Sequence, residues 1–176
     1  EYMNIYLDDK LRTKNIVRAY YSDQDYLGFQ SIYANNLKLA EAVSDYIAEG
    51  DVPENISLPK CRGEKIGQFI LDGAHNEDAL HKLASRFKDY KPVVVFSSTQ
   101  DRDTASLIKI VEEFADKLII TSIPDNDRSI NPESITTKHI KERDPLNALK
   151  IAVELKRNAD ILVCGSLYLC AHVREI

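Results

Sequence analysis

One segment of the sequence, from Phe69 to Leu80, has the residue types of a ligand-binding turn. An apolar run ends at Asp72, and Gly73, His75 and Asn76 follow before a helical pattern begins. The aspartate supplies hydrogen-bond acceptors, the glycine lets the backbone bend closely, and the histidine supplies a titratable ring. Asn76 can cap the helix, whose first amides would face the same crevice as an anion-binding surface. The segment therefore predicts a polar site between a strand and a helix.

Four apolar runs predict the strands that would hold such turns in place. They are residues 69–71, 93–96, 118–120 and 161–164. Uninterrupted apolar strands are buried on both faces, which is typical of parallel sheets. Apolar residues at i, i+3, i+4 and i+7 predict amphipathic helices around residues 80–87 and 107–115. This alternation predicts a doubly wound, Rossmann-like α/β fold, with a mostly parallel sheet flanked by helices.

Small or polar residues follow each of the four predicted strands. They are Asp72, Ser97-Ser98, Thr121-Ser122 and Gly165-Ser166. In a doubly wound sheet the ligand crevice lies beyond the carboxyl ends of the strands, which all meet at one edge. Ordinary loop polarity can explain any single strand end. Four such ends together favour a ligand-binding edge.

Shorter elements complete the predicted unit. Asn131-Pro132 and Asp144-Pro145 are each typical of a helix cap followed by proline at the first helical position. Residues 139–141 predict a short edge strand. We expect Asp103 to cap the helix that follows it, and Ser166 is also a candidate cap for a helix starting near residue 167.

The first 58 residues differ from the rest and predict a small appendage. A helical pattern covers residues 35–48, and residues 16–21 predict an extended segment. Residues 50–59 carry two prolines and few large apolar residues, which is typical of a linker. The sequence thus predicts two parts, residues 1–58 and residues 59–176.

Composition excludes several classes of protein. The net charge of −5 and a pI near 5.4 leave no basic surface for nucleic acid. No apolar run approaches the roughly 20 residues that span a bilayer, so we expect no membrane partner. The three cysteines form no CxxC pair, which argues against a disulfide framework and a zinc knuckle and favours the reducing cytoplasm. His75 and His81 do not have the i, i+4 spacing of metal ligands on a helix.

Several motifs resemble those of the folylpolyglutamate synthase/dihydrofolate synthase family, a branch of the Mur ligases. They are "ILDGAHN" before a helix, Arg62-Gly63-Glu64 before the first apolar strand, "FSSTQDRD", "TSIPDNDRS" and "ILVCGSLYL". The resemblance covers residues 59–176 and is most specific in the pair "DGAHN" and "GSLYL". Residues 1–58 match only loosely.

The resemblance implies an ATP-dependent ligase. Residues 59–176 would be its C-terminal glutamate-ligase domain, and residues 1–58 would be the tail of a central ATPase domain. In such enzymes ATP and Mg²⁺ activate the carboxylate of folate or dihydropteroate as an acyl phosphate, and the amine of L-glutamate displaces phosphate. The sequence has no G-x-x-x-x-G-K-[ST] loop to bind the triphosphate. We therefore expect an N-terminal ATPase half to supply that loop and most metal ligands, and the chain alone to be inactive.

The resemblance also implies roles for individual residues. Asp72 would accept hydrogen bonds from the nucleotide ribose or the ammonium of glutamate, and His75 would lie near the γ-phosphate and the incoming amine. Arg62 would reach the nucleotide from the linker. Ser166 would bind the carboxylate of glutamate through its hydroxyl and the helix amides. No catalytic role is predicted for the segment Asp101 to Asp103.

Two departures and two alternatives accompany the resemblance. Glu77 stands where the family commonly has proline, and an acidic first turn competes with an anionic ligand. Lys60 and Cys61 replace the usual proline and glycine before the linker arginine. The alternatives are a non-catalytic doubly wound module that binds a nucleotide or a protein, and another Mur-type amino-acid ligase domain.

Overall fold

The computed structural model describes residues 2–5, 17–20, 59–156 and 159–176. The chain divides into two compact units, Glu1–Leu58 and Pro59–Ile176. In the first unit, strand β1 (Tyr2–Ile5) pairs antiparallel with β2 (Val17–Tyr20), which confirms the predicted extended segment at residues 16–21. The predicted helix at 35–48, and all of the predicted linker except Pro59, lie outside the described residues.

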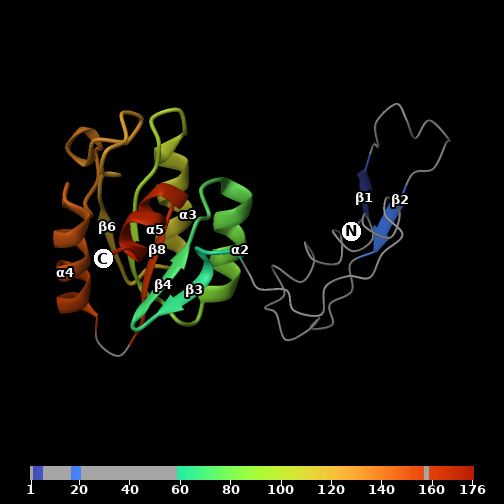
Figure 1. Cartoon of the computed structure of the whole chain (residues 1–176), viewed down its shortest axis with the longest axis horizontal. Helices are drawn as coiled ribbons and strands as arrows, with labels where there is room; N and C mark the ends of the chain where they lie inside the picture. The colour runs from blue at the N-terminus through green and yellow to red at the C-terminus, as the bar shows by residue number, and fades with distance from the viewer. Residues whose placement is uncertain (1, 6–16, 21–58, 157–158) are drawn as a thin grey trace. The chain divides into compact units, whose positions relative to one another are not determined.

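A six-stranded sheet forms the centre of the second unit, in the order β3-β4-β8-β5-β6-β7 (Figure 1). The strands are β3 (Arg62–Ile66), β4 (Phe69–Asp72), β5 (Val93–Phe96), β6 (Lys117–Ile120), β7 (Ile140–Lys141) and β8 (Ile161–Cys164). All neighbours pair in parallel except β3 and β4, which form an antiparallel hairpin. The predicted doubly wound, mostly parallel α/β fold is confirmed.

Within residues 59–156 and 159–176, three α-helices connect strands and a fourth follows the last strand, and each begins at a side chain that caps it. They are α2 (Glu77–Phe87), α3 (Thr104–Phe114), α4 (Pro145–Leu155) and α5 (Leu167–Arg174). The caps, in the same order, are Asn76, Asp103, Asp144 and Ser166. Each of these side chains accepts a hydrogen bond from a backbone N–H in the first turn, which otherwise has no partner within the helix. The four predicted caps are therefore confirmed.

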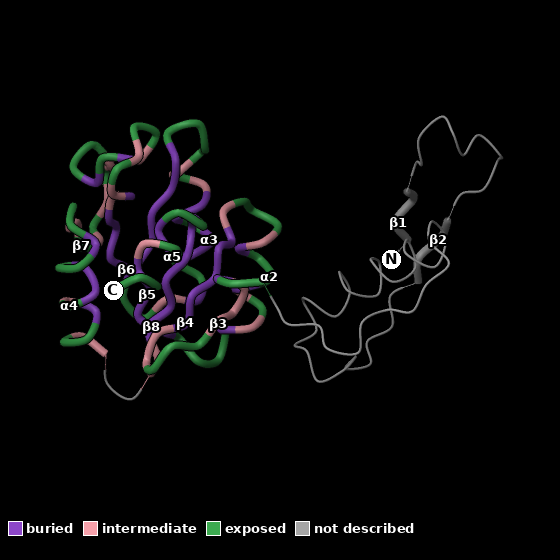
Figure 2. Tube along the Cα trace, viewed as in Figure 1, coloured by how far each residue is buried: buried purple, intermediate pink, exposed green. Residues whose placement is uncertain are grey.

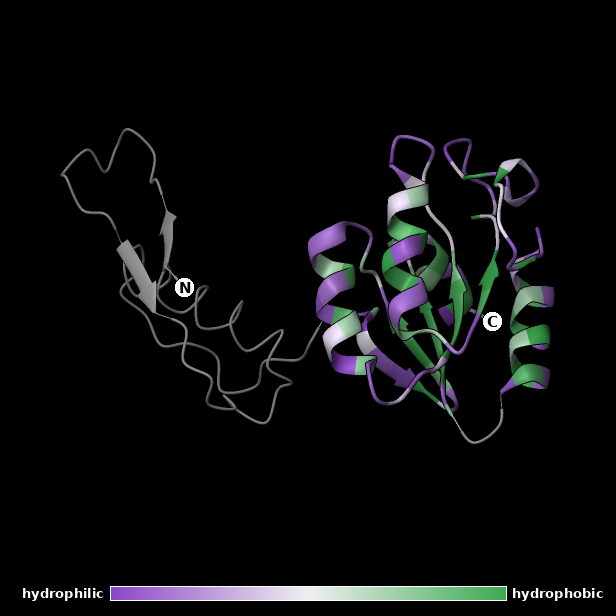
Figure 3. Cartoon of the chain, turned by 180° about the vertical axis from the view of Figure 1, so that it is seen from behind, coloured by the Kyte–Doolittle hydropathy of each residue, from purple (hydrophilic) through white to green (hydrophobic). Residues whose placement is uncertain are grey.

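The sheet separates two apolar cores, one on each face. Strand residues such as Phe96 and Leu162 pack with α2 and α3, whereas Val95 and Val163 pack with α4 and α5. Figure 2 shows the central strands as a continuous buried layer. In Figure 3, viewed from behind, the central strands are hydrophobic, whereas the helices carry both hydrophilic and hydrophobic residues. Burial on both faces explains why these strands lack alternating polar residues.

Two local predictions need correction. Arg62 is not in a linker before the sheet, because it begins strand β3. The antiparallel hairpin partner of β4 was not predicted, since β3 is too polar to resemble the apolar central strands. Asn131-Pro132 begins only a 3-10 turn, η2 (Pro132–Ser134), because Ile135 returns to an extended backbone. The predicted edge strand at 139–141 is confirmed as β7.

The three cysteines, Cys61, Cys164 and Cys170, are buried free thiols. Among the described residues, no helix is both long and apolar enough to cross a membrane.

Candidate functional site

The turn between β4 and α2 is held by its own polar groups. Asp72, the last residue of β4, is only 3% exposed, and its Oδ1 accepts a hydrogen bond of 2.9 Å from the N–H of Ala74. Asn76 accepts from the N–H of Ala79 over 2.9 Å and starts the helix. The carboxylate therefore shapes the turn, and any contact with a ligand would come in addition to this bond.

The imidazole of His75 is oriented by the same turn. Its Nδ1 lies 2.7 Å from the carbonyl oxygen of Gly73. Because a carbonyl oxygen can only accept, this contact requires the proton on Nδ1. Nε2 is then the acceptor nitrogen of the neutral ring. The side chain of His75 is partly exposed, whereas that of Asp72 is buried.

The turn between β8 and α5 adjoins the first one. The N–H of Gly165 donates to the carbonyl oxygen of Ala74 over 2.8 Å. Gly165 has a φ of 93°, and Ser166, 4% exposed, accepts from the amides of Tyr168 (3.1 Å) and Leu169 (3.5 Å). The predicted capping role of Ser166 is thus confirmed, and its contact with a ligand stays a prediction.

Gly73 packs closely against the start of α5. A Cβ at this position would lie 2.1 Å from the side chain of Leu167, the first residue of α5. The N–H of Gly73 donates to the carbonyl oxygen of Cys61 over 2.7 Å. Arg62, which follows Cys61 in the sequence, lies directly opposite Asp72 in the β3–β4 pair. Two predicted nucleotide-binding residues are therefore neighbours across a hairpin.

The neighbouring strand end carries Ser97 and Ser98, which the sequence placed at the ligand-binding edge without giving either residue a role of its own. The Oγ atoms of Ser97 and Ser98 are buried and make no hydrogen bond within the described part of the chain. The backbone of Ser97 is close to the β8 turn, because a Cβ on Gly165 would lie 2.0 Å from the carbonyl oxygen of Ser97. The polar edge thus continues from β4 through β8 to β5.

A groove of about 700 Å³ occupies the far end of this edge, beyond β6 and β7. Its lining consists of Gln100, residues 122–127 and 129–131, and residues 142–145. None of Arg62, Asp72, His75 and Ser166 lines it. The groove was not predicted, because loop conformation sets its shape, and its only signal in the sequence is the polar run after residue 120.

The two aspartates of the segment Asp101 to Asp103 have structural roles as hydrogen-bond acceptors. Hydrogen bonds from the Ser106 side chain and amide lower the pKa of Asp103, the cap of α3. A hydrogen bond from the Thr99 side chain lowers the pKa of Asp101. Within residues 59–156 and 159–176, no cluster of three or more His, Cys, Asp or Glu side chains could hold a metal ion.

The fold therefore brings the predicted residues to one end of the sheet, but their side chains differ in solvent exposure. Asp72 and His75 follow β4, Ser166 follows the adjacent β8, and Arg62 is paired with β4. His75 and Arg62 are partly exposed, whereas Asp72 and Ser166 are almost completely covered. The arrangement can present an imidazole and a guanidinium to a ligand at this edge.

Comparison with protein families identifies this unit. Residues 60–167 match the model described as the Mur ligase, glutamate ligase domain. The chain belongs to this family. The match covers the hairpin, both turns and the whole sheet, so the family assignment includes the candidate site.

Curated relatives fall into two groups. The chain is 30% identical over 115 residues to a dihydrofolate synthase/folylpolyglutamate synthase of Bacillus subtilis, covering 60% of this chain and 26% of that protein. It is 28% identical over 132 residues to a UDP-N-acetylmuramoyl-L-alanyl-D-glutamate–2,6-diaminopimelate ligase of Wolinella succinogenes, covering 65% and 30%. The chain thus spans less than a third of the length of either relative.

Solved structures share the fold. A bifunctional folylpolyglutamate synthase/dihydrofolate synthase from Yersinia pestis has a TM-score of 0.65 at 22% identity, over 81% of this chain and 38% of that one. A Mycobacterium tuberculosis folylpolyglutamate synthase complexed with ADP and AMPPCP has a TM-score of 0.66 at 18% identity, over 82% and 39%. At these identities the likeness concerns the fold.

Proposed function

We propose that this chain is the C-terminal domain of an ATP-dependent ligase that adds L-glutamate to folate or dihydropteroate. The observation that carries the proposal is the hydrogen-bonded junction of the Asp72–Asn76 turn with the Gly165–Ser166 turn. It puts an oriented imidazole and a helix start at the carboxyl end of the sheet, where doubly wound folds bind ligands. The name of the Bacillus subtilis relative supports the substrate class.

The reaction that these residues would serve is amide formation. The acceptor carboxylate would take the γ-phosphoryl group of ATP and release ADP. The amine of glutamate would then attack the acyl carbon, form the C–N bond and expel phosphate. Nε2 of His75 would accept the proton lost by the amine. Ser166 and the first amides of α5 would bind the carboxylate of glutamate, and Arg62 and Asp72 would bind the nucleotide.

A composite site is part of the proposal, with residues 1–58 as the tail of the central ATPase domain. The sequence has no phosphate-binding loop, and the described residues offer no metal cluster, so a separate nucleotide-binding half would supply both. One related structure contains Mn, AMPPNP and L-glutamate. Closure of the two halves would exclude water from the acyl phosphate. The buried free thiols are compatible with a cytoplasmic location.

Reconstitution tests this function. We expect the chain alone to release no phosphate from ATP above background. Mixed with, or fused to, the nucleotide-binding half, it should form the amide of folate or dihydropteroate with glutamate, detected by mass. An assembled complex without amide formation on either acceptor would contradict the proposal, and so would ATP hydrolysis by the isolated chain that survives repurification.

A second candidate is a ligase for diaminopimelate. It is favoured by two relatives, from Wolinella succinogenes and Helicobacter pylori, that carry that name. The same reconstituted protein should be offered glutamate and diaminopimelate with each acceptor class. Incorporation of diaminopimelate into a muramoyl dipeptide, with none of glutamate into folate, would favour the second candidate.

A further inference from the structure

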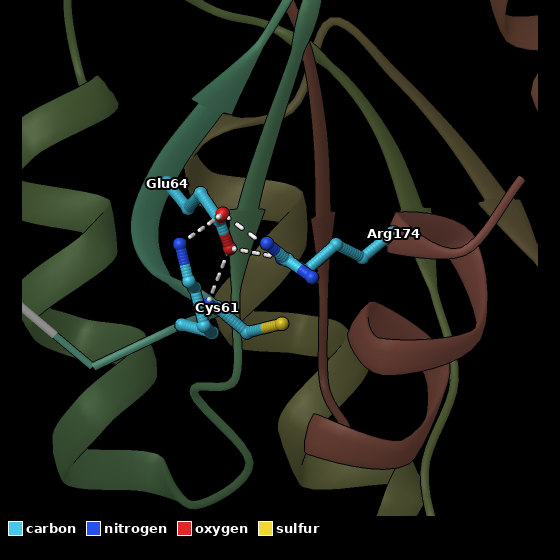
Figure 4. Close-up of polar contacts among 4 residues, drawn as sticks. Cys61, Glu64 and Arg174 are labelled. Carbon is cyan, nitrogen blue, oxygen red and sulfur yellow. Dashed lines mark hydrogen bonds and ion pairs between the residues drawn. The ribbon is translucent and has the colours of Figure 1, made fainter.

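The carboxylate of Glu64 joins the beginning of the second unit to its last helix (Figure 4). The backbone N–H of Cys61 donates to Oε2 over 2.9 Å. The Nε of Arg174, on α5, lies 3.0 Å from Oε1 and 3.2 Å from Oε2. The Nζ of Lys60 lies 3.7 Å from Oε1. One side chain on strand β3 therefore contacts two segments that are more than a hundred positions apart in the sequence.

Cys61 needs this support, because its backbone is in an unfavourable region. Its φ is 56°, a left-handed conformation that residues with a Cβ rarely adopt. Such a conformation persists only where surrounding contacts determine it. Here the N–H of Cys61 donates to Glu64, and its carbonyl oxygen accepts from the N–H of Gly73 over 2.7 Å. The thiol side chain is buried in the core that contains α5.

The same backbone leads directly to the candidate site. Arg62 follows Cys61 in the chain and lies opposite Asp72. Gly73, whose amide binds Cys61, begins the turn that carries His75. Lys60 and Cys61 also come immediately after the boundary between the two compact units at Leu58 and Pro59. A change in the backbone conformation of Cys61 would therefore displace Arg62, to which Cys61 is directly bonded. It would also disturb the Asp72–Asn76 turn, because Gly73 donates a hydrogen bond to Cys61.

We propose that Glu64 is a positioning residue, which holds Cys61 in its left-handed conformation and so orients Arg62 and the Asp72–Asn76 turn for nucleotide binding. Glu64 itself acts through Cys61 and Arg174 and touches no ligand. The inference deepens the proposed function, because it depends on Arg62 and Asp72 as nucleotide-binding residues.

The first test measures local order in this chain by amide hydrogen exchange. Glu64→Ala should accelerate exchange at Cys61 and Gly73 by at least about tenfold, because it removes the acceptor that fixes this backbone. Glu64→Gln keeps an acceptor for the Cys61 amide and should give a smaller effect. The matched control is Lys65→Met. Lys65 lies next to Glu64 on β3, and the substitution breaks its 2.6 Å ion pair with Asp160. Unchanged exchange in Glu64→Ala would overturn the proposal.

The second test measures nucleotide affinity of the assembled protein by calorimetry with AMPPNP. We expect Glu64→Ala to weaken binding by at least about fivefold, and Glu64→Gln to recover most of that loss. Lys65→Met should bind like the wild type. Unchanged affinity in Glu64→Ala would overturn the positioning role, even where exchange at Cys61 is faster. Because AMPPNP binding needs no amide product, this result is independent of whether glutamate is the amino acid that is added.

Discussion

The amide of Gly165 donates to the carbonyl oxygen of Ala74 over 2.8 Å, and this hydrogen bond joins the turns that follow β4 and β8. The parallel pairing of these two strands brings both carboxyl ends to the same place. A backbone hydrogen bond thus connects the two halves of the candidate site. Substitutions that displace the backbone at this junction should therefore lower the free energy of unfolding more than substitutions of exposed side chains.

Gly165→Ala tests how tightly the two turns are packed. The new Cβ would lie 2.0 Å from the carbonyl oxygen of Ser97 and 2.5 Å from the ring of Phe96, at a φ of 93°. We expect the free energy of unfolding, measured with urea, to fall by about 3 kcal/mol. Gly67→Ala is the matched control, because its φ is 57° and no atom lies within 4 Å. That variant should lose only about 1 kcal/mol; equal losses in the two variants would contradict close packing at Gly165.

Ser166→Ala separates capping from ligand binding. Loss of the cap should lower the free energy of unfolding by about 1 kcal/mol. Asp103→Ala removes the cap of α3, away from the β4–β8 junction, and should cost about the same. In the assembled enzyme, only Ser166→Ala should raise KM for glutamate. If both variants leave that KM unchanged, Ser166 is a cap and not a binding residue.

His75→Asn distinguishes orientation from proton acceptance. The asparagine amide can still donate to the carbonyl oxygen of Gly73, but nothing replaces Nε2. We expect kcat for amide formation to fall by about 10²-fold or more, with an unchanged free energy of unfolding. His81→Asn, at an exposed position on α2, is the control and should retain activity. Full activity of His75→Asn would exclude His75 as the proton acceptor.

The acid dependence of stability should report the Glu64 contacts. The donated N–H of Cys61, followed by the guanidinium of Arg174, lowers the pKa of Glu64. A group with a lowered pKa in the folded state stabilises it above the unfolded-state pKa, about 4.3 for glutamate, and loses this contribution as pH falls through the folded-state pKa. Urea midpoints of the wild type and Glu64→Gln should therefore differ at pH 7 and converge at low pH. A constant difference from pH 7 to 3 would argue against the ion pair.

The cysteines should be unreactive while the chain is folded. Burial raises the pKa of the Cys164 and Cys170 thiols, and burial next to Glu64 raises that of Cys61. Because the thiolate is the nucleophile, a chromogenic disulfide reagent should label none of them at pH 7 in native buffer. All three thiols should react in denaturant. Rapid labelling of a single thiol in native buffer would indicate local opening at that residue.

Sequence patterns predicted the centre of the fold well, because its signals are local. The run Val93 to Phe96 is apolar at every position, and the strand is buried at every position. Asn76, Asp144 and Ser166 precede helical patterns, and each caps a helix. The four strand ends meet at one edge as predicted, because parallel strands end on the same side of the sheet whatever their order in it.

The parts that sequence patterns missed depend on contacts between distant segments. Strand β3 is polar and becomes a strand because it pairs with β4 across the tight turn at Gly67. The near-complete burial of Asp72 and Ser166 results from the packing of adjacent turns, which no local pattern encodes. The ion pair of Glu64 with Arg174 spans almost the whole unit and has no spacing signal.

The two outer strands of the six-stranded sheet disfavour pairing of this sheet with a strand of another molecule. Strand β7 has only two residues, and β3 carries Glu64 and Lys65 and has an irregular register after Arg62. Short, charged or irregular outer strands are poor templates for the addition of a strand from another molecule. The apolar central strands, which would be prone to amyloid-like stacking if they were accessible, are therefore flanked by strands that discourage intermolecular β-pairing.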